Sequence, residues 1–249
     1  MGASELFDLK GKTALVTGGS RGLGLAIVEA FAGCGANVVI ASRKLEACEA
    51  AAKQVRAVGG HAVALQCHVG QWNELEAVVA RAWDAFGGLD ILVNNAGMSL
   101  LADSSETTTE AAFDKVIAVN FKGPFRMTAL VGCRMHAGRG GSIINIGSTG
   151  SVRPHPTFAP YSGAKAGLNA ITKAHALEYA PNVRVNAILP GAFVTDVSKS
   201  WSKDKEAGLR NALRRFGQPR EIATAALYLA SSASGYTTGS LIRVDGGRE

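Results

Sequence analysis

The sequence predicts an α/β fold, in which helices pack on a mainly parallel β-sheet. Short apolar runs rich in β-branched residues alternate with helical patterns along the chain, and such alternation implies parallel strand pairing with right-handed crossovers. With 47% hydrophobic residues and 30 glycines among 249 residues, the chain can bury a large core and make many tight turns. Because no stretch resembles a linker, we expect residues 1–249 to form one domain.

Apolar periodicity and turn residues give the expected bounds of each element in order. The first half should hold strands at 12–17, 37–41, 61–66 and 89–93 and helices at 25–33, 45–58 and 73–86. Thr107 to Glu110 has the spacing of a capping box that begins a long helix containing Asn120. The second half should hold strands at 142–146, 183–189 and 241–244 and helices at 161–179 and 219–230. A helical stretch at about 197–215 is expected within a substrate lid at about 194–216.

A glycine-rich turn connects the first expected strand to the first expected helix. Gly18, Gly22 and Gly24 let the backbone approach a pyrophosphate closely, and the N–H groups of the helix N-terminus meet its charge. The Gly-x-x-x-Gly-x-Gly spacing departs from the common Gly-x-Gly-x-x-Gly dinucleotide fingerprint. The turn therefore predicts a phosphate site, and a tight turn without a ligand is the alternative.

The end of the second expected strand bears on the choice of dinucleotide. In NAD binders an acidic residue about 20 positions past the loop holds the ribose, whereas a nearby Arg accommodates the additional phosphate of NADP. Here Ser42 and Arg43 follow the strand without a carboxylate, and Arg21 lies in the glycine turn. These groups favour a 2′-phosphate through charge-assisted hydrogen bonds. Two solvated arginines are the alternative.

Tyr161 and Lys165 are four residues apart in an expected helix, so their side chains share one face. A cation close to a phenol favours the phenolate and lowers its pKa from about 10 toward neutrality. Ser148 follows the strand at 142–146, at the edge where open α/β sheets place their ligands. Tyr-x-x-x-Lys also occurs by chance on surface helices, so the assignment depends on the other groups.

Asn120 lies in a helical pattern that contains Pro124 four residues later. Since proline has no N–H, the Asn120 carbonyl loses its usual helical partner and can hold a water. A simple kink that fits the helix to the sheet is the alternative. The stretch Asn94-Asn95-Ala96-Gly97 directly follows the fourth expected strand. Its small residues leave room for a planar ligand and its asparagines can tie loops together, although it also suits an ordinary turn.

Charge and cysteine usage argue against several classes of protein. The net charge is +6, but basic residues alternate with acids and form no basic and aromatic stripe, so we expect a solvated surface and no nucleic-acid partner. The four cysteines have no metal or redox spacing. There is no signal-peptide pattern and no apolar run of bilayer length. We therefore expect reduced thiols, no metal, no membrane partner and a cytoplasmic location.

Taken in order, these motifs resemble those of the short-chain dehydrogenase/reductase family. The resemblance covers essentially the whole chain, from the turn at Gly18 to Asp245-Gly246-Gly247. It implies a Rossmann-type, doubly wound, mainly parallel seven-stranded sheet with helices on both faces. It also implies hydride transfer between a nicotinamide and a carbonyl or secondary alcohol.

The resemblance assigns roles to individual residues. Tyr161 exchanges the proton and Ser148 holds the substrate oxygen. Lys165 lowers the phenol pKa and binds the nicotinamide ribose, and the Asn120 carbonyl holds a relay water. The substrate is expected near Ser148, Tyr161, His155 and Phe193. The NADP(H) cofactor is expected near Gly18, Ser20, Arg21, Gly22, Leu23, Gly24, Ser42, Arg43, His68, Val69, Asn95, Ala96, Gly97, Tyr161, Lys165, Pro190, Gly191, Phe193 and Thr195.

One position departs from the family pattern. His68 follows the third strand, where many members carry an aspartate near the adenine. The adenine contacts of the family therefore do not transfer directly, although the ring nitrogens of His68 can still bond the base.

The sequence leaves the substrate open. The resemblance fits 3-oxoacyl thioester reductases and sugar-acid or polyol dehydrogenases equally, and a cofactor-sensing binding protein is the non-enzymatic alternative. From Lys199 to Arg220 seven basic residues accompany two acidic ones, and Arg139, Arg153 and His155 add to this charge. An anionic substrate or carrier is one interpretation; a solvated lid is the other.

The family also suggests a homotetramer or homodimer that pairs the helices of Asn120 and Tyr161. The residues expected to allow close approach between copies are Ala164, Gly167, Ala170 and Ala174.

Overall fold

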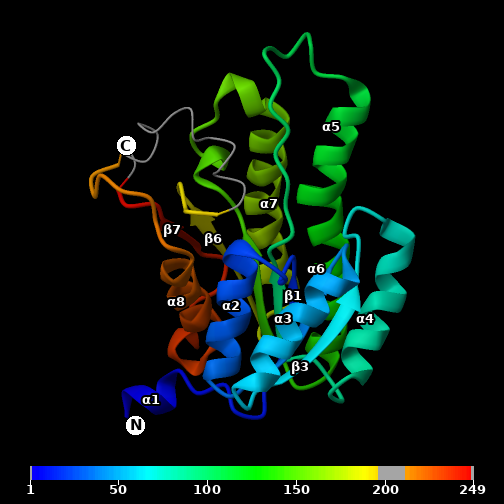
Figure 1. Cartoon of the computed structure of the whole chain (residues 1–249), viewed down its shortest axis with the longest axis vertical. Coiled ribbons are helices and arrows are strands. Elements are labelled where there is room, and N and C mark those ends of the chain that lie inside the picture. Colours follow the sequence, from blue (N-terminus) through cyan, green and yellow to red (C-terminus); the bar gives the residue numbers. More distant parts are fainter. Residues whose placement is uncertain (1, 196–210, 248–249) are drawn as a thin grey trace.

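The computed structural model describes residues 2–195 and 211–247. Its centre is a seven-stranded sheet with the order β3-β2-β1-β4-β5-β6-β7, in which every neighbouring pair is parallel (Figure 1). The chain winds outward from β1 in both directions, so the sheet is doubly wound. The strands are β1 (Thr13–Thr17), β2 (Asn37–Ser42), β3 (His61–Gln66), β4 (Ile91–Asn94), β5 (Gly141–Ile146), β6 (Val183–Pro190) and β7 (Leu241–Val244).

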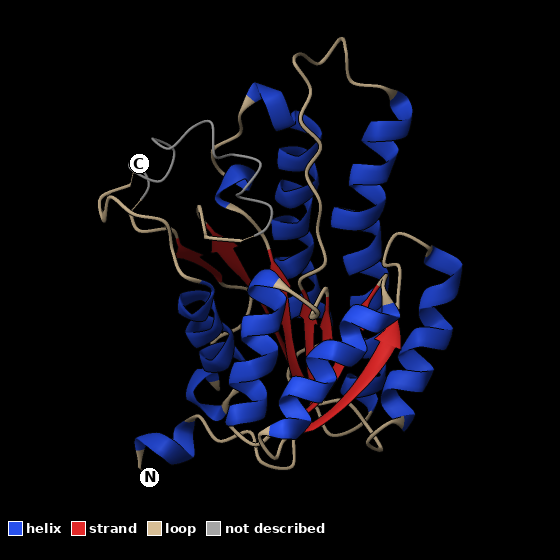
Figure 2. Cartoon of the chain, viewed as in Figure 1, coloured by secondary structure: helices blue, strands red, loops and turns tan. Residues whose placement is uncertain are grey.

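Helices cover both faces of the sheet (Figure 2). One hydrophobic core lies between the sheet and α2, α3 and α8, and a second lies between the sheet and α4, α6 and α7. The helices are α1 (Ala3–Leu6), α2 (Gly22–Gly33), α3 (Leu45–Ala57), α4 (Leu75–Asp84), α5 (Glu110–Ile117), α6 (Gly123–Ala137), α7 (Ala159–Glu178) and α8 (Pro219–Ala230). Within residues 2–195 and 211–247, no helix combines the length and apolarity needed to cross a bilayer.

Successive residues of a central strand serve opposite cores. Ala14 and Val16 of β1 pack in the core under α2, α3 and α8, whereas Leu15 packs in the core under α4, α6 and α7. All of β1 is buried. Because both faces of the sheet are covered, such strands are continuous apolar runs in the sequence rather than alternating patterns.

The predicted seven-stranded sheet is confirmed, and all of its pairs are parallel. The expected start of the first long helix at Leu25 is wrong, because α2 begins at Gly22 and takes the last glycines of the turn into its first turn. The expected capping box at Thr107 is also wrong. Thr109 caps α5, since its side chain accepts the Ala112 N–H at 3.2 Å.

The expected helical lid overlaps the described residues only in part, because residues 196–210 lie outside them. Residues 211–215 are not helical. The N–H groups of Ala212 and Leu213 donate to the carbonyls of Gly247 and Gly246, at 3.1 and 3.0 Å. These long-range bonds replace the local bonds of a helix, so the helical prediction fails at this end.

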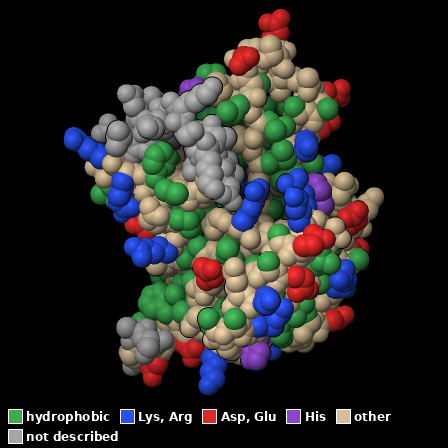
Figure 3. Space-filling view, in the orientation of Figure 1, with side chains coloured by type: hydrophobic (Ala, Val, Ile, Leu, Met, Phe, Trp, Pro, Cys, Tyr) green, Lys and Arg blue, Asp and Glu red, His purple; other side chains and the backbone are tan. Residues whose placement is uncertain are grey.

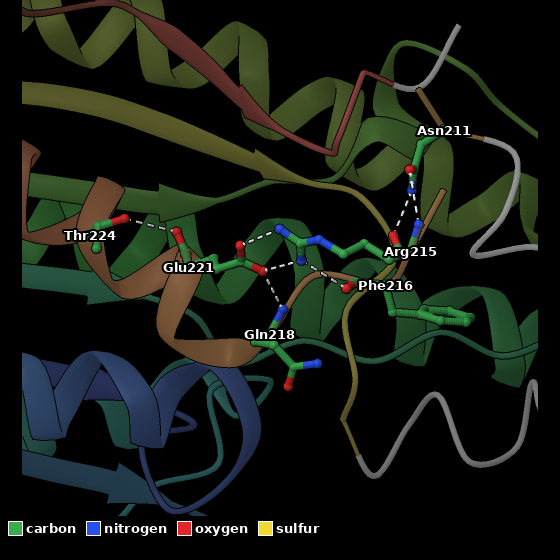
Figure 4. Close-up of polar contacts among 6 residues, drawn as sticks. All are labelled: Asn211, Arg215, Phe216, Gln218, Glu221 and Thr224. Atoms are coloured by element: carbon green, nitrogen blue, oxygen red, sulfur yellow. Dashed lines mark hydrogen bonds and ion pairs between the residues drawn. The ribbon is translucent and has the colours of Figure 1, made fainter. Parts of the chain in front are cut away.

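An ion pair fastens this segment to α8, as Figure 4 shows. The Arg215 guanidinium donates to both carboxylate oxygens of Glu221, at 2.7 and 2.6 Å. The same carboxylate accepts the Gln218 N–H at 2.7 Å, at the start of the helix. The Arg215 guanidinium and this N–H lower the pKa of Glu221 to about 2. Arg215 is therefore committed to a partner within its own chain.

Candidate active site

The site lies along the carboxyl edge of the central strands. Gly18 follows β1, Asn95 follows β4, Ser148 lies just beyond β5 and Gly191 follows β6. Because the strands are all parallel, these segments meet at one edge of the sheet, where open α/β sheets bind their ligands.

The turn between β1 and α2 has a shape that requires glycine. Gly18 has φ +65°, in the left-handed region. A Cβ atom at Gly24 would collide with the Gly18 carbonyl oxygen, so the helix closes directly onto the turn. Arg21 occupies the N-cap of α2 and makes no side-chain cap hydrogen bond. The N–H groups of the first helical turn are therefore left for an anion.

Asn95 holds the glycine turn to the loop after β4. Its side-chain Nδ2 donates to the carbonyls of Thr17 and Gly18, at 2.9 and 3.1 Å. In return, the Thr17 hydroxyl oxygen accepts the N–H groups of Asn95 and Ala96, at 3.0 and 3.1 Å. The expectation that an asparagine ties neighbouring loops together is confirmed. Thr17 is a positioning residue that the sequence analysis missed, because a strand-end threonine gives no signal of its partners.

One contact beside this turn joins two residues of the predicted cofactor site. The Ser20 hydroxyl donates to the Ser42 hydroxyl at 3.0 Å, which joins the turn to the end of β2. Arg21 and Arg43 are exposed, and Lys and Arg side chains gather near the centre of the face shown in Figure 3. Exposed guanidinium groups can bind a phosphate through charge-assisted hydrogen bonds.

His68 and Val69 follow β3 at the far end of the predicted cofactor site. The His68 Nδ1 atom accepts the Gly70 N–H at 3.1 Å. Nδ1 is thus used within the chain, and Nε2 is the ring nitrogen left to meet an adenine. Val69 is 7% exposed, and its carbonyl oxygen lies where a Cβ atom at Gly123 would be. Val69 therefore packs against the start of α6 and contributes more to the core than to an open site.

The long helix expected around Asn120 is interrupted at Asn120 itself, whose backbone carbonyl is predicted to hold a water. Residues Ala118–Lys122 form a π-helical segment between α5 and α6, in which the Gly123 N–H donates to the Ala118 carbonyl five residues back. Pro124 lies in the first turn of α6 and has no N–H for the Asn120 carbonyl. Such π segments often occur at functional sites.

The sequence analysis did not foresee that the Asn120 side chain holds a neighbouring loop in place. This side chain is fully buried. Its Nδ2 donates to the Met98 and Val116 carbonyls, at 2.7 and 2.9 Å, and its Oδ1 accepts the Met98 N–H at 3.2 Å. Asn120 therefore fixes the loop after Gly97 in addition to offering its own carbonyl.

Lys165 is a buried cation, 2% exposed, in the middle of the site. Its Nζ donates to the Ile146 carbonyl at 2.6 Å, which ties α7 to the end of β5. The ammonium lies 5.9 Å from the centroid of the Tyr161 ring. Burial lowers the pKa of Lys165 from 10.5 to about 8.

The Ser148 side chain lies close enough to the Tyr161 phenol to act on its pKa. The Ser148 oxygen also accepts the Gly150 N–H at 3.0 Å, so its one proton remains for the phenol or a substrate oxygen. Burial raises the pKa of Tyr161, and Ser148 opposes this rise. The expected lowering of the Tyr161 pKa by Lys165 does not appear in this structure, where burial of the phenol has the largest effect on its pKa.

Two side chains, of which Asn169 is buried, support Ser148, and neither has a sequence signal. Asn169 on α7 donates from Nδ2 to the Ser151 hydroxyl at 2.7 Å, and Ser151 donates to the Ser148 carbonyl. A similar chain lies deeper, where Asn94 donates to Asn145 and Asn145 donates to Thr172, both at 2.9 Å. These contacts join β4, β5 and α7 beneath the reacting groups.

The segment after β6 reaches back toward the glycine turn. Gly191 directly follows Pro190, the last residue of β6, and its N–H donates to the Val244 carbonyl at 2.9 Å. This bond fixes the path of the chain as it leaves the strand. Thr195 approaches Gly22, where a Cβ atom would lie 3.7 Å from its methyl carbon. Phe193 is only 6% exposed and belongs to a hydrophobic core. The predicted substrate contact of Phe193 is thus limited to a small edge of its ring.

On the substrate side, aromatic rings connect His155 to Tyr161. His155 stacks on Phe158 with 5.5 Å between ring centroids, and Phe158 meets Tyr161 edge-on at 6.2 Å. His155 is exposed, and its Nδ1 lies 2.9 Å from the Thr157 hydroxyl. It borders the site through Phe158 rather than by direct contact with Tyr161. Beside Pro160, a cavity of about 280 Å³ opens between the loop at 100–103 and α5.

Fewer of the basic residues expected around the substrate can be assigned to it in the described part of the chain. Arg215 is paired with Glu221, and Lys199, Lys203, Lys205 and Arg210 lie outside the described residues. Arg139 precedes β5 and packs against Gly88, near the amino edge of the sheet, so its expected place beside the substrate is wrong. Among residues 2–195 and 211–247, no three His, Cys, Asp or Glu side chains are grouped to hold a metal ion.

Comparison with known proteins agrees with this geometry. The family model for short chain dehydrogenases matches residues 12–206. The chain therefore belongs to the short-chain dehydrogenase/reductase family. Membership makes it an oxidoreductase that acts on alcohol or carbonyl groups with a nicotinamide cofactor.

Its relatives are named for different substrates. The 3beta-hydroxysteroid dehydrogenase 1 of Eggerthella lenta is 41% identical and covers 96% of this chain and 94% of its own. A 3-oxoacyl (acyl-carrier-protein) reductase of Agrobacterium tumefaciens, solved with NADP bound, has a TM-score of 0.93 and 33% identity over 99% and 98% of the chains. A provisionally assigned gluconate dehydrogenase of the same species has a TM-score of 0.92 and 36% identity over 97% of each.

The buried ammonium predicts a pH dependence of stability. The folded chain loses the Lys165 proton near pH 8, whereas the unfolded chain keeps it to about 10.5. The cost of burying the charge is full below pH 8 and disappears as pH rises toward 10.5. Relative to Lys165→Met, the unchanged protein should gain about 3 kcal/mol of unfolding free energy across this window.

Urea unfolding at several pH values measures this difference. Lys173→Met is the matched control, because Lys173 is exposed on the same helix and should leave the pH dependence unchanged. Equal pH dependence for Lys165→Met and the unchanged protein would contradict a buried, titrating ammonium.

Proposed function

We propose that the chain is an NADP(H)-dependent oxidoreductase that interconverts a carbonyl and a secondary alcohol, with Tyr161 as the general acid and base. The position of Tyr161, which lies close to Ser148 and within 5.9 Å of the buried Lys165 ammonium, carries this proposal. When bound, the nicotinamide supplies or accepts the hydride. The chain supplies the proton and the groups that hold the substrate oxygen.

Each group has a distinct task in the proposed reaction. Burial keeps the Tyr161 phenol protonated, so it can donate to the oxygen of a carbonyl substrate as that oxygen gains charge. The free proton of Ser148 orients and stabilises the same oxygen. In the reverse direction the Lys165 cation stabilises a phenolate that has accepted the alcohol proton. The Asn120 carbonyl holds a water that relays protons toward Lys165.

The preference for NADP(H) rests on the groups at the end of β2. Ser42 and Arg43 stand where an NAD-specific chain would place a carboxylate, and Arg21 is exposed at the N-cap of α2. The related 3-oxoacyl reductase, which was solved with NADP, gives this preference further support.

For the substrate we propose a 3-oxoacyl thioester, with a sugar acid or polyol as the alternative. Relatives named for each class have similar identity and structural agreement, so activity on a panel of 3-oxoacyl thioesters, polyols and simple ketones with NADPH or NADP decides between them. Arg153 is exposed and lies five residues after Ser148. An anionic substrate should therefore gain an advantage that shrinks as salt is raised.

A cofactor-sensing protein without turnover is the non-enzymatic alternative. It would not need Asn120, Ser148, Tyr161 and Lys165 together, and the presence of all four supports catalysis. Binding of NADPH without oxidation by any carbonyl of the panel would favour the sensing protein.

Replacement of the phenol tests the central assignment. Tyr161→Phe removes only the hydroxyl, so turnover should fall by at least about a hundredfold, the scale of general acid catalysis. NADPH affinity should stay within a few fold, measured by nucleotide fluorescence. Tyr236→Phe, which alters a fully exposed phenol, should retain full activity. Substantial turnover by Tyr161→Phe would refute the role of Tyr161.

Replacement of Arg43 tests the cofactor. Arg43→Ala should weaken NADPH binding by about tenfold or more, the value of a charged hydrogen bond, and leave NADH almost unchanged. Lys44→Ala is the control, because Lys44 is the exposed neighbour that carries the same charge. Equal losses for the two cofactors in Arg43→Ala would show that Arg43 does not contact the 2′-phosphate.

We also propose that the protein is cytoplasmic and forms a homotetramer. One interface would pair the helical region around Asn120 (α5 and α6) and the helix of Tyr161 (α7) with the same elements of a neighbouring copy. The support is exposed apolar surface there, with Phe113 46% and Leu177 82% exposed. Ala164 is 2% exposed and a Cβ at Gly167 would lie 2.9 Å from the Phe121 ring, so these two pack within the chain. Light scattering at micromolar concentration should give a tetramer and Leu177→Lys a smaller species; a monomeric parent protein would refute the assembly.

A further inference from the structure

The Ser42 hydroxyl belongs to a chain of three polar side chains at the end of β2. The Ser20 hydroxyl donates to it at 3.0 Å. On its other side the Cys48 sulfur lies 3.0 Å from the Ser42 oxygen, and either atom can be the donor. The Lys44 carbonyl is a more distant acceptor, at 3.4 Å. Cys48 therefore touches the predicted phosphate site without facing it.

The direction of the hydrogen bonds among Ser20, Ser42 and Cys48 decides whether the Ser42 hydroxyl can donate to a phosphate. A hydroxyl has one proton and two lone pairs, and phosphate oxygens accept hydrogen bonds. If Ser42 donates to Cys48 or to the Lys44 carbonyl, it has no proton left for the phosphate. If the Cys48 thiol donates to the Ser42 oxygen, the Ser42 proton is free to point at the ligand.

The position of Cys48 suits it to be the donor. It is fully buried in the first turn of α3. Burial raises the pKa of its thiol, with Glu49 and Glu46 adding to the rise and Ser42 opposing it. The sulfur therefore keeps its proton at neutral pH, and the thiol has the Ser42 oxygen as its short-range partner.

We propose that Cys48 is a positioning residue for the 2′-phosphate of NADP(H), because its thiol donates to Ser42 and so orients the Ser42 proton toward that phosphate. Cys48 makes no contact with the cofactor itself. Arg21 and Arg43 supply the charge, and the thiol fixes the direction of one hydrogen bond. This role rests on the proposed preference for NADP(H), since NAD(H) has a ribose hydroxyl at the same place.

Calorimetric titration of the full chain with adenosine 2′,5′-bisphosphate and with 5′-AMP tests the role without any turnover. Cys48→Ala should weaken the bisphosphate about three- to tenfold, the value of one hydrogen bond, and leave 5′-AMP unchanged. Cys48→Ser should bind both like the unchanged chain, because its hydroxyl also donates. Cys67→Ala is the matched control: this neighbouring buried cysteine reaches Ser42 only through its backbone N–H.

A double-mutant cycle separates positioning from a general effect on packing. If Cys48 acts through Ser42, then adding Cys48→Ala to Ser42→Ala should cost no further affinity for the bisphosphate. Cys48→Val, which fills the space without donating, should behave like Cys48→Ala and replaces it if the alanine variant does not fold.

The outcomes are distinct. Equal losses for the two nucleotides in Cys48→Ala, no loss at all, or full additivity with Ser42→Ala would overturn the role of Cys48 while leaving the preference for NADP(H) intact. An unchanged chain that binds the bisphosphate no better than 5′-AMP would refute the cofactor preference, and the role of Cys48 with it.

Discussion

The bond from the Lys165 ammonium to the Ile146 carbonyl is the contact on which the site depends. A buried cation is costly unless it is well satisfied, and here a strand-end carbonyl at 2.6 Å satisfies one of its protons. The bond fixes α7 against β5, and therefore Tyr161 against Ser148. The reacting groups come from separate elements, yet one interaction sets their separation.

Buried amides extend this arrangement across the sheet. Asn95 joins β4 to the glycine turn, and Asn120 holds the loop after β4 against the interrupted helix. Below them, Asn94, Asn145 and Thr172 connect β4, β5 and α7. Since buried polar groups that lose a partner are expensive, such a network favours a single arrangement of the loops. The part of the site proposed to bind the cofactor is thus built from fixed backbone.

The substrate half is built differently. His155 is exposed, and the described end of the expected lid is held by Arg215 and Glu221 to α8 rather than facing the site. Two solved relatives that agree closely with this chain in fold are named for an acyl carrier substrate and gluconate, and a relative similar in sequence is named for a steroid. One fold can serve different substrates because the loops that border the site vary while the sheet and helices that support them are shared.

The sequence by itself determined the fold class and the order of the elements, and it pointed to the residues proposed to react, because apolar periodicity, glycine spacing and the four-residue step from Tyr161 to Lys165 are local signals. Only the tertiary structure decided that Lys165 reaches the Ile146 carbonyl and that Asn95 reaches the Gly18 carbonyl. It also placed Phe193 in the core and Arg139 at the far edge of the sheet. Partners distant in the sequence leave no periodic pattern, so their contacts, and the pKa shifts that burial causes, appear only when the chain is folded.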